Sequence, residues 1–256
     1  FYCAPTLARR GASHVGVGRP MIALAFVSVG ACLVSVSAPA SSQLAAHTCI
    51  KGKELRLRAA DGTRLAAHTF GSGETAVVLA HGNGSDLCQW VPYARRLAGR
   101  GFFVVAFDFR GHGFSQRRRY PISERFAGDV AAVVRLTRRL NKRDVHLIGS
   151  SLGGSASLVA AANVVPPVAS VVSLSAPARF RRQQALDVAP RLRVPVLYVA
   201  SADEPVSIAD DARALYQATG SADKQLKIVP GRRHGLRILE GASEARALVE
   251  DFLRTH

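Results

Sequence analysis

Short apolar runs that alternate with helical patterns constrain the fold of this chain more than any other feature of its sequence. Ala76–Ala80 is a continuous apolar run between Gly73 and His81-Gly82, and similar runs follow at 102–107, 145–148, 171–174, 196–200 and 226–229. Helical patterns occupy 87–100, 123–140, 152–163, 208–219 and 242–254. This alternation predicts a mostly parallel sheet with helices on both faces, built from right-handed crossovers.

The segment before the first apolar run is predicted to form a hairpin. Residues 55–57 and 64–69 flank Asp61-Gly62, a pair typical of a tight turn between antiparallel strands. No linker or repeat follows residue 50. We therefore expect an α/β fold with roughly eight strands in one domain over 55–256, after a leader at 1–40 and a mature N-terminal segment at 41–54.

The leader has the pattern of an export signal. Arg9, Arg10 and Arg19 precede an apolar run at 21–36, and Ala38-Pro39-Ala40 fits a small-residue cleavage site. We expect a secreted or cell-envelope protein of a bacterium, with no membrane span in the mature chain. An uncleaved anchor is an alternative, although the run is short for a span. Lipid attachment at Cys32 is another.

Positive charge is the main departure from average composition. The chain has 34 Lys and Arg residues against 18 Asp and Glu, a formal net charge of +16. Such a field affects encounter with anionic partners. No zinc-finger spacing, aromatic RNA-binding strand or heptad-linked basic region accompanies the charge. We therefore expect no specific nucleic-acid partner, and solvated surface charge is the simpler interpretation.

Two cysteines, Cys49 and Cys88, lie outside the leader. In an exported protein an even pair suggests a disulfide, here between the segment after the leader and the start of the first helix. Two free or buried thiols are the alternative. Neither cysteine has a second ligand at zinc-site spacing, so we expect no metal.

Gly149-Ser150-Ser151-Leu152-Gly153 matches the G-x-S-x-G pattern of a nucleophile on a strand-to-helix turn. The match lies directly after an apolar run and before a helical pattern, which is the placement that this chemistry needs. Small residues leave room for the sharp turn, and the N–H groups of the following helix can stabilise an oxyanion. The alternative is a Gly/Ser-rich helix start without a function.

Three segments together resemble the α/β-hydrolase family over residues 55–254. They are His81-Gly82-Asn83-Gly84, the segment at 108–115, and the turn at Ser151. The resemblance implies a serine hydrolase that uses no cofactor, with oxyanion donors at the backbone N–H groups of Asn83 and Leu152. It also implies that Asp108 and His112 belong to the scaffold.

In this family the nucleophile is followed along the chain by the acid and then by the histidine. His234 lies after the run at 226–229 and is the expected general base, since the other downstream histidine is terminal. Asp203 lies after the run at 196–200 and resembles the family's acid. Glu204 is its neighbouring competitor, because adjacent residues face differently and only geometry separates them.

The expected substrate is a small acyl ester. Only residues 176–193 separate two strand candidates, where many relatives insert a cap, so we expect a short or absent cap and an open site that favours soluble esters over long lipids. A peptidase or amidase, or an acyltransferase, would use the same mechanism. A catalytically silent secreted binding protein is the alternative of another class.

Arginines gather in three segments that are predicted to follow strands. Because parallel strands end at one edge of the sheet, we expect them to ring the mouth of the site and to steer anionic substrates or dock on an anionic envelope surface. A solvated surface is the alternative. The residues are Arg117, Arg118, Arg119, Arg179, Arg181, Arg182, Arg232 and Arg233.

Overall fold

An eight-stranded sheet forms the centre of the computed structural model, which describes residues 48–50, 54–116, 125–205 and 208–256. The strand order is β1-β2-β4-β3-β5-β6-β7-β8. Strand β2 pairs antiparallel with β1 and β4, and every other neighbouring pair is parallel. The predicted α/β fold is confirmed. The strands are β1 (Leu55–Arg58), β2 (Arg64–Phe70), β3 (Ala76–Ala80), β4 (Phe103–Phe107), β5 (Val145–Ser150), β6 (Ser170–Leu174), β7 (Val196–Ser201) and β8 (Lys224–Val229).

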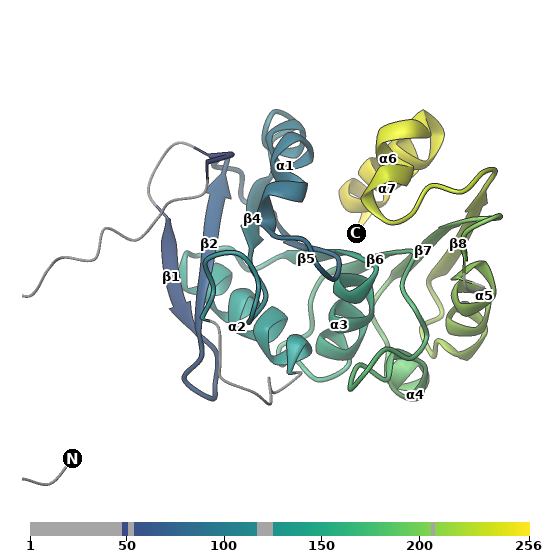
Figure 1. Ribbon diagram of the computed structural model, residues 1–256, viewed down its shortest axis with the longest axis horizontal. Coiled ribbons are helices and arrows are strands. Elements are labelled where there is room, and N and C mark those ends of the chain that lie inside the picture. Colours follow the sequence, from purple (N-terminus) through teal and green to yellow (C-terminus); the bar gives the residue numbers. More distant parts are fainter. Residues whose placement is uncertain (1–47, 51–53, 117–124, 206–207) are drawn as a thin grey trace, which may run out of the picture. The chain divides into compact units, whose positions relative to one another are not determined.

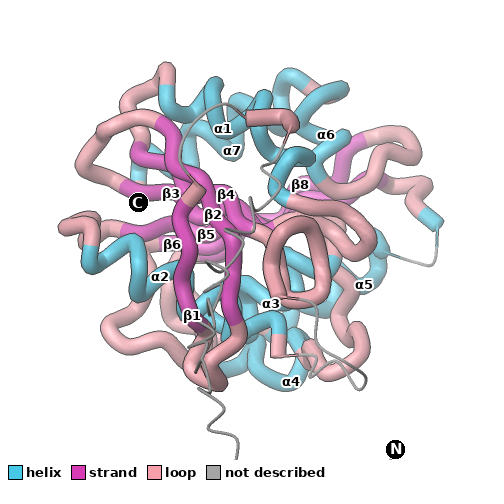
Figure 2. The backbone as a smooth tube through the Cα atoms, turned by 60° about the vertical axis from the view of Figure 1, so that its left-hand side comes forward, coloured by secondary structure: helices cyan, strands magenta, loops and turns pink. Residues whose placement is uncertain are grey.

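Helices cover both faces of this sheet (Figure 1). One face carries α1 (Val91–Ala98), α6 (Leu236–Gly241) and α7 (Ser243–Thr255). The other carries α2 (Phe126–Arg139), α3 (Leu152–Ala161), α4 (Ala185–Val188) and α5 (Ile208–Ala218). Figure 2, in which the hairpin of β1 and β2 comes forward, shows the same two layers on either side of the strands.

Strand β3 shows why its apolar run is continuous. All of its residues are fully buried. Successive side chains of a strand point to opposite faces. Val77 and Leu79 therefore pack in the core with α1 and α7, and Val78 packs in the core with α2 and α3. A strand with helices on both sides has no solvent face, so it needs apolar residues at every position.

The structure departs from the predicted helices in the shortest elements. The segment predicted as one helix over 87–100 is a 3-10 turn, η1 (Leu87–Trp90), followed by α1. Pro92 explains the division, because a proline has no N–H and fits only the first turn of a helix. The sequence did not predict α6, α4 or the 3-10 turn η2 (Ala189–Arg191), which are too short for a periodic pattern.

Only α4 and η2 lie between β6 and β7, so the connection is as short as predicted. All described residues belong to one compact unit over 44–256. The predicted leader at 1–40 lies outside the described residues. Among those that are described, no helix has both the length and the apolar character needed to cross a membrane.

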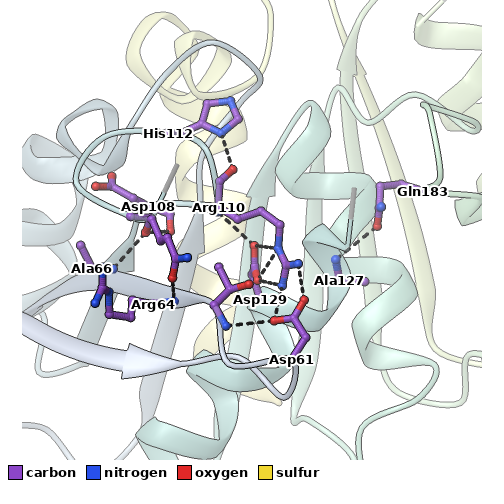
Figure 3. A network of polar contacts seen from close by, with 12 residues as sticks. Asp61, Arg64, Ala66, Asp108, Arg110, His112, Ala127, Asp129 and Gln183 are labelled. Atoms are coloured by element: carbon purple, nitrogen blue, oxygen red, sulfur yellow. Dashed lines mark hydrogen bonds and ion pairs between the residues drawn. The ribbon is translucent and has the colours of Figure 1, made fainter. Parts of the chain in front are cut away.

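A buried ion-pair cluster fastens the hairpin to the sheet (Figure 3). The guanidinium of Arg110 donates to Asp61 in the hairpin turn at 2.7 Å and to Asp129 in α2 at 2.6 Å. The side chains of Arg110 and Asp129 are 3% and 0% exposed. Burial raises the pKa of Asp61, but hydrogen bonds from Arg110 and Thr63 outweigh it and hold that pKa well below its usual range.

We expect Arg110→Met to lower the free energy of unfolding by about 3–5 kcal/mol, because it leaves the buried Asp129 carboxylate without its cationic partner. Denaturant unfolding measures the loss. Arg179→Met is the matched control, since Arg179 and Asp187 form an exposed pair whose removal should cost about 0–1 kcal/mol. Equal, small losses in both variants would contradict this role for Arg110.

The disulfide predicted between Cys49 and Cys88 is present, with the two Cα atoms 5.8 Å apart. It links the described segment at 48–50 to η1 and packs against the core on the α1 side. The bond closes a loop across a sequence separation of 39.

We expect Cys49→Ala/Cys88→Ala to lower the free energy of unfolding by about 4 kcal/mol, the chain-entropy value for a loop of this length. Urea unfolding with and without a reducing agent measures the effect. Reduction should destabilise the natural chain by a similar amount and leave the double variant unchanged. A double variant as stable as the oxidised protein would show that the bond contributes nothing.

Candidate active site

Ser151 stands on a sharp turn between β5 and α3. Its φ of 53° and ψ of −118° are unfavourable for a residue with a side chain. The Ser151 N–H donates to the carbonyl of Leu174 on β6 at 2.8 Å, which fixes the turn to the sheet. A Cβ on Gly149 would lie 2.2 Å from the Gly153 carbonyl oxygen, and a Cβ on Gly153 would lie 2.2 Å from that of Ala80. Both glycines are therefore required sterically.

His234 follows β8 and lines the same cavity as Ser151. Its Nδ1 lies 2.5 Å from Oε2 of Glu204, and its side chain is 42% exposed. A carboxylate only accepts hydrogen bonds, so Nδ1 carries a proton, and in the neutral ring Nε2 then has the lone pair. This tautomer suits a base that takes a proton from a serine hydroxyl.

The carboxylate that contacts His234 belongs to Glu204, so the prediction that Asp203 orients the histidine is wrong. Asp203 is exposed. Its backbone N–H donates to the Gly231 carbonyl at 3.0 Å, and its carboxylate has no hydrogen bond to any residue that the structure describes. The Glu204 side chain is 0% exposed. Of these two adjacent residues in the loop after β7, the exposed one is thus Asp203 and the buried one that reaches the histidine is Glu204.

Ser175 is a site residue that the sequence reasoning missed. It follows β6 directly, is fully buried and has a φ of 49°. Its Oγ donates to Oε1 of Glu204 at 2.8 Å and accepts from the backbone N–H of Gly235 at 2.8 Å. The Ser201 N–H donates to the same Oε1 at 2.6 Å. Ser175 thus joins the acid to the histidine loop, and its place after a buried strand was the available signal.

Of the two predicted oxyanion donors, one lines the same cavity as Ser151 and the other follows Ser151 directly in the chain. Asn83 lines the cavity, and Leu152 begins α3 with its side chain buried. Within the described part of the chain, neither backbone N–H has a protein acceptor. Both are therefore available to a ligand, and the loop before Asn83 is fixed by a hydrogen bond from the Gly82 N–H to Oε1 of Gln89 at 3.0 Å.

His81 also holds the loop that contains Asn83 in place. Burial lowers its pKa to about 3, so the ring is neutral. Its Nε2 accepts from the Phe109 N–H at 3.0 Å, and its Nδ1–H therefore donates to the Gly82 carbonyl at 2.7 Å. Asp108 also has a scaffold role, since its carboxylate accepts from the backbone N–H groups of Leu87 and Phe114 at 2.8 and 2.7 Å.

The cavity at Ser151 has a volume of about 690 Å³. Among the described residues its lining includes no carboxylate, and no group of three or more His, Cys, Asp or Glu side chains there is placed to hold a metal ion. The lining is polar and includes neutral amides, hydroxyls and cations: Gly82, Asn83, Ser85, Gln89, Ser150, Ser151, Arg232, Arg233, His234 and Arg237.

The structure brings only part of the predicted arginine ring to this cavity. Arg232 and Arg233 line it, together with Arg237, which was not predicted. Two other predicted members lie elsewhere: Arg179 pairs with Asp187 on α4, and the guanidinium of Arg181 lies over its neighbour Phe180. Arg182 is exposed and is not among the lining residues, and Arg117, Arg118 and Arg119 lie outside the described residues.

Comparison with known proteins agrees with this architecture. A sequence model of the family described as the alpha/beta hydrolase fold matches residues 75–224. The chain is 36% identical over 107 residues to serine hydrolase BPHL of Mus musculus, a stretch that is 41% of this chain and 36% of that protein. The chain thus spans about a third of the length of this curated relative.

Two solved structures have the same fold. An esterase of Pyrococcus furiosus superposes with a TM-score of 0.69 at 17% identity, over 80% of this chain and 92% of the esterase. A hydrolase of Pseudomonas aeruginosa superposes with a TM-score of 0.68 at 20% identity, over 80% of this chain and 99% of the hydrolase.

Proposed function

Because the chain belongs to the α/β-hydrolase family, we propose that it is a serine hydrolase that cleaves carboxylic esters through an acyl-enzyme on Ser151. One observation carries the proposal: Ser151 and His234 line the same cavity, and the histidine is held by the buried carboxylate of Glu204. A serine beside a histidine whose Nδ1 is held by an acid is the arrangement that activates a hydroxyl for attack on a carbonyl.

The proposed reaction begins when Ser151 Oγ attacks the acyl carbonyl carbon and its proton passes to Nε2 of His234. The oxyanion accepts hydrogen bonds from the backbone N–H groups of Asn83 and Leu152. The C–O bond to the alcohol then breaks, and the alcohol takes the proton from His234. Water then attacks the acyl carbon while His234 removes its proton. The bond between the acyl carbon and Ser151 Oγ breaks, the proton passes from His234 back to Oγ, and a carboxylic acid is released.

The cavity supports a small, water-soluble acyl group. Its lining is mainly polar, and no cap domain lies between β6 and β7 to enclose a long chain. An apolar enclosure is what long acyl chains require. A peptidase or amidase would use the same groups on a different leaving group, and an acyltransferase would use an acceptor other than water.

Hydrolysis of 4-nitrophenyl acetate and octanoate tests the proposal. We expect a burst of nitrophenol equal to the amount of enzyme, a transient acyl adduct on Ser151 by mass spectrometry, and a higher kcat/KM for acetate. A preference for octanoate would contradict the open-site interpretation. A folded chain that neither turns over nor acquires the adduct would favour a silent binding protein.

We further propose that the mature protein is extracytoplasmic. The Cys49–Cys88 disulfide supports this, since such bonds persist in oxidising compartments. Cell fractionation with N-terminal sequencing tests it. A chain that starts near residue 41 in the extracytoplasmic fraction is the expected result, and a reduced, uncleaved chain in the cytoplasm would contradict it.

A further inference from the structure

The cations beside the nucleophile suggest what kind of ester the site takes. We propose that the substrate carries an additional anionic group, a carboxylate or a phosphate, which Arg232 and Arg237 bind while Ser151 attacks the acyl carbon. The inference rests on the proposed function and specifies its substrate class. It concerns a subsite of the same cavity, formed by the loop after β8 and the first turn of α6.

The described residues that line this cavity include three arginines and no carboxylate. Arg232, Arg233 and Arg237 are exposed and line it, and none of them forms an ion pair with any residue that the structure describes. The nearby carboxylate of Glu204 is buried behind His234 and already accepts from Ser201 and Ser175. By contrast, many arginines elsewhere on the molecule have carboxylate partners: Arg96, Arg100, Arg110, Arg179, Arg213 and Arg254.

The backbone that carries these arginines is held in place. The Ser201 Oγ donates to the Arg233 carbonyl at 2.7 Å, and the Asp203 N–H donates to the Gly231 carbonyl at 3.0 Å. The Arg237 N–H donates to the His234 carbonyl at 3.2 Å, so this arginine and the proposed base belong to the same turn. Because the backbone of these arginines is held beside the base, a substrate anion that they bind lies within one arginine side chain of the reacting groups.

Arg233 contributes less than its neighbours to this subsite. A Cβ added to Gly241 would lie 2.1 Å from its Nε, so the Arg233 side chain packs against the backbone at the end of α6. The guanidinium groups of Arg232 and Arg237 form no hydrogen bond with any residue that the structure describes. Their guanidinium groups present forked donors, which suit the oxygens of a carboxylate or a phosphate.

The test compares esters of equal length that differ only at the far end. The 4-nitrophenyl monoester of glutaric acid carries a free carboxylate, 4-nitrophenyl 4-phosphonobutanoate carries a phosphonate as a phosphate analogue, and 4-nitrophenyl pentanoate is neutral. We expect kcat/KM to be about tenfold higher for at least one anionic ester than for the neutral one. The ester with the larger ratio identifies the anionic group. About 0.5 M NaCl should reduce the ratio severalfold.

Arg232→Gln and Arg237→Gln should each lower kcat/KM for the preferred anionic ester about five- to tenfold and change that for the neutral ester less than about twofold. Arg179→Gln is the matched control, because it removes an equal charge from an arginine that does not line the cavity. Equal losses of kcat/KM in all three variants would mean that the arginines act only through the overall positive charge of the protein. That result would overturn the subsite.

The outcomes separate this inference from the proposed function. Neutral and anionic esters hydrolysed equally well would overturn the subsite and leave the esterase intact. If the folded protein hydrolyses none of them, calorimetric binding to Ser151→Ala still tests the subsite with monomethyl glutarate and the neutral methyl pentanoate. Tighter binding of the anion that is lost in Arg232→Gln supports it, and equal or absent binding overturns it.

Discussion

Ser151→Ala should lower kcat for 4-nitrophenyl acetate by about 10⁴- to 10⁶-fold, because no other hydroxyl takes the strained position on the turn after β5. The remaining rate would come from substrate binding and the oxyanion donors alone. Initial rates at saturating substrate measure the loss, and thermal unfolding shows that the variant is folded.

Ser157→Ala is the control for this substitution. Ser157 lies in the same helix, α3, and its buried Oγ has no hydrogen-bond partner among the described residues. Removing it deletes the same atom without touching the cavity, so kcat should change less than about twofold. Comparable losses in the two variants would mean that the serine hydroxyl at 151 does no chemistry.

Glu204→Gln should lower kcat by about 10⁴-fold, whereas Asp203→Asn should change it less than about twofold. Oε1 of Glu204 accepts from both the Ser201 N–H and the Ser175 hydroxyl. A glutamine would keep its carbonyl oxygen there and turn its NH₂ group toward His234. Nδ1 would then have to accept, and Nε2 would carry the proton, which is the wrong tautomer for a base.

The comparison of these two variants isolates the role of the acid. Each replaces one carboxylate with its amide, at neighbouring positions of one loop, so general effects of charge on the arginine-rich site are matched. Steady-state kinetics on one ester suffices. A large loss in Asp203→Asn with little in Glu204→Gln would restore the original assignment from the sequence and contradict the hydrogen bonds of the structure.

Most of the sheet could be predicted from the sequence. Strand β3 matched its apolar run because a strand buried on both faces leaves a continuous signal, and the hairpin was marked by Asp61-Gly62. The turn at Ser151 could also be predicted. A Cβ at position 149 or 153 would lie about 2.2 Å from a backbone carbonyl oxygen, so both positions require glycine.

The identity of the acid could not be predicted, because it depends on side-chain direction in a loop. Asp203 and Glu204 differ by one position, and no periodicity governs which of them turns inward after β7. Ser175 was missed for a related reason: its role comes from contacts with Glu204 and Gly235, which lie 29 and 60 residues away in the chain. Arg237 lines the cavity because it lies in α6, and this helix is too short to show a periodic apolar pattern in the sequence.

Labelling with a fluorophosphonate is the most direct test of the central claim that Ser151 is an activated nucleophile. The reagent should modify the purified protein once, with the adduct on Ser151 by fragment mass spectrometry, and should not modify Ser151→Ala. His234→Ala should label far more slowly. A folded natural chain that takes no label, or one that labels equally well without Ser151, would contradict the account.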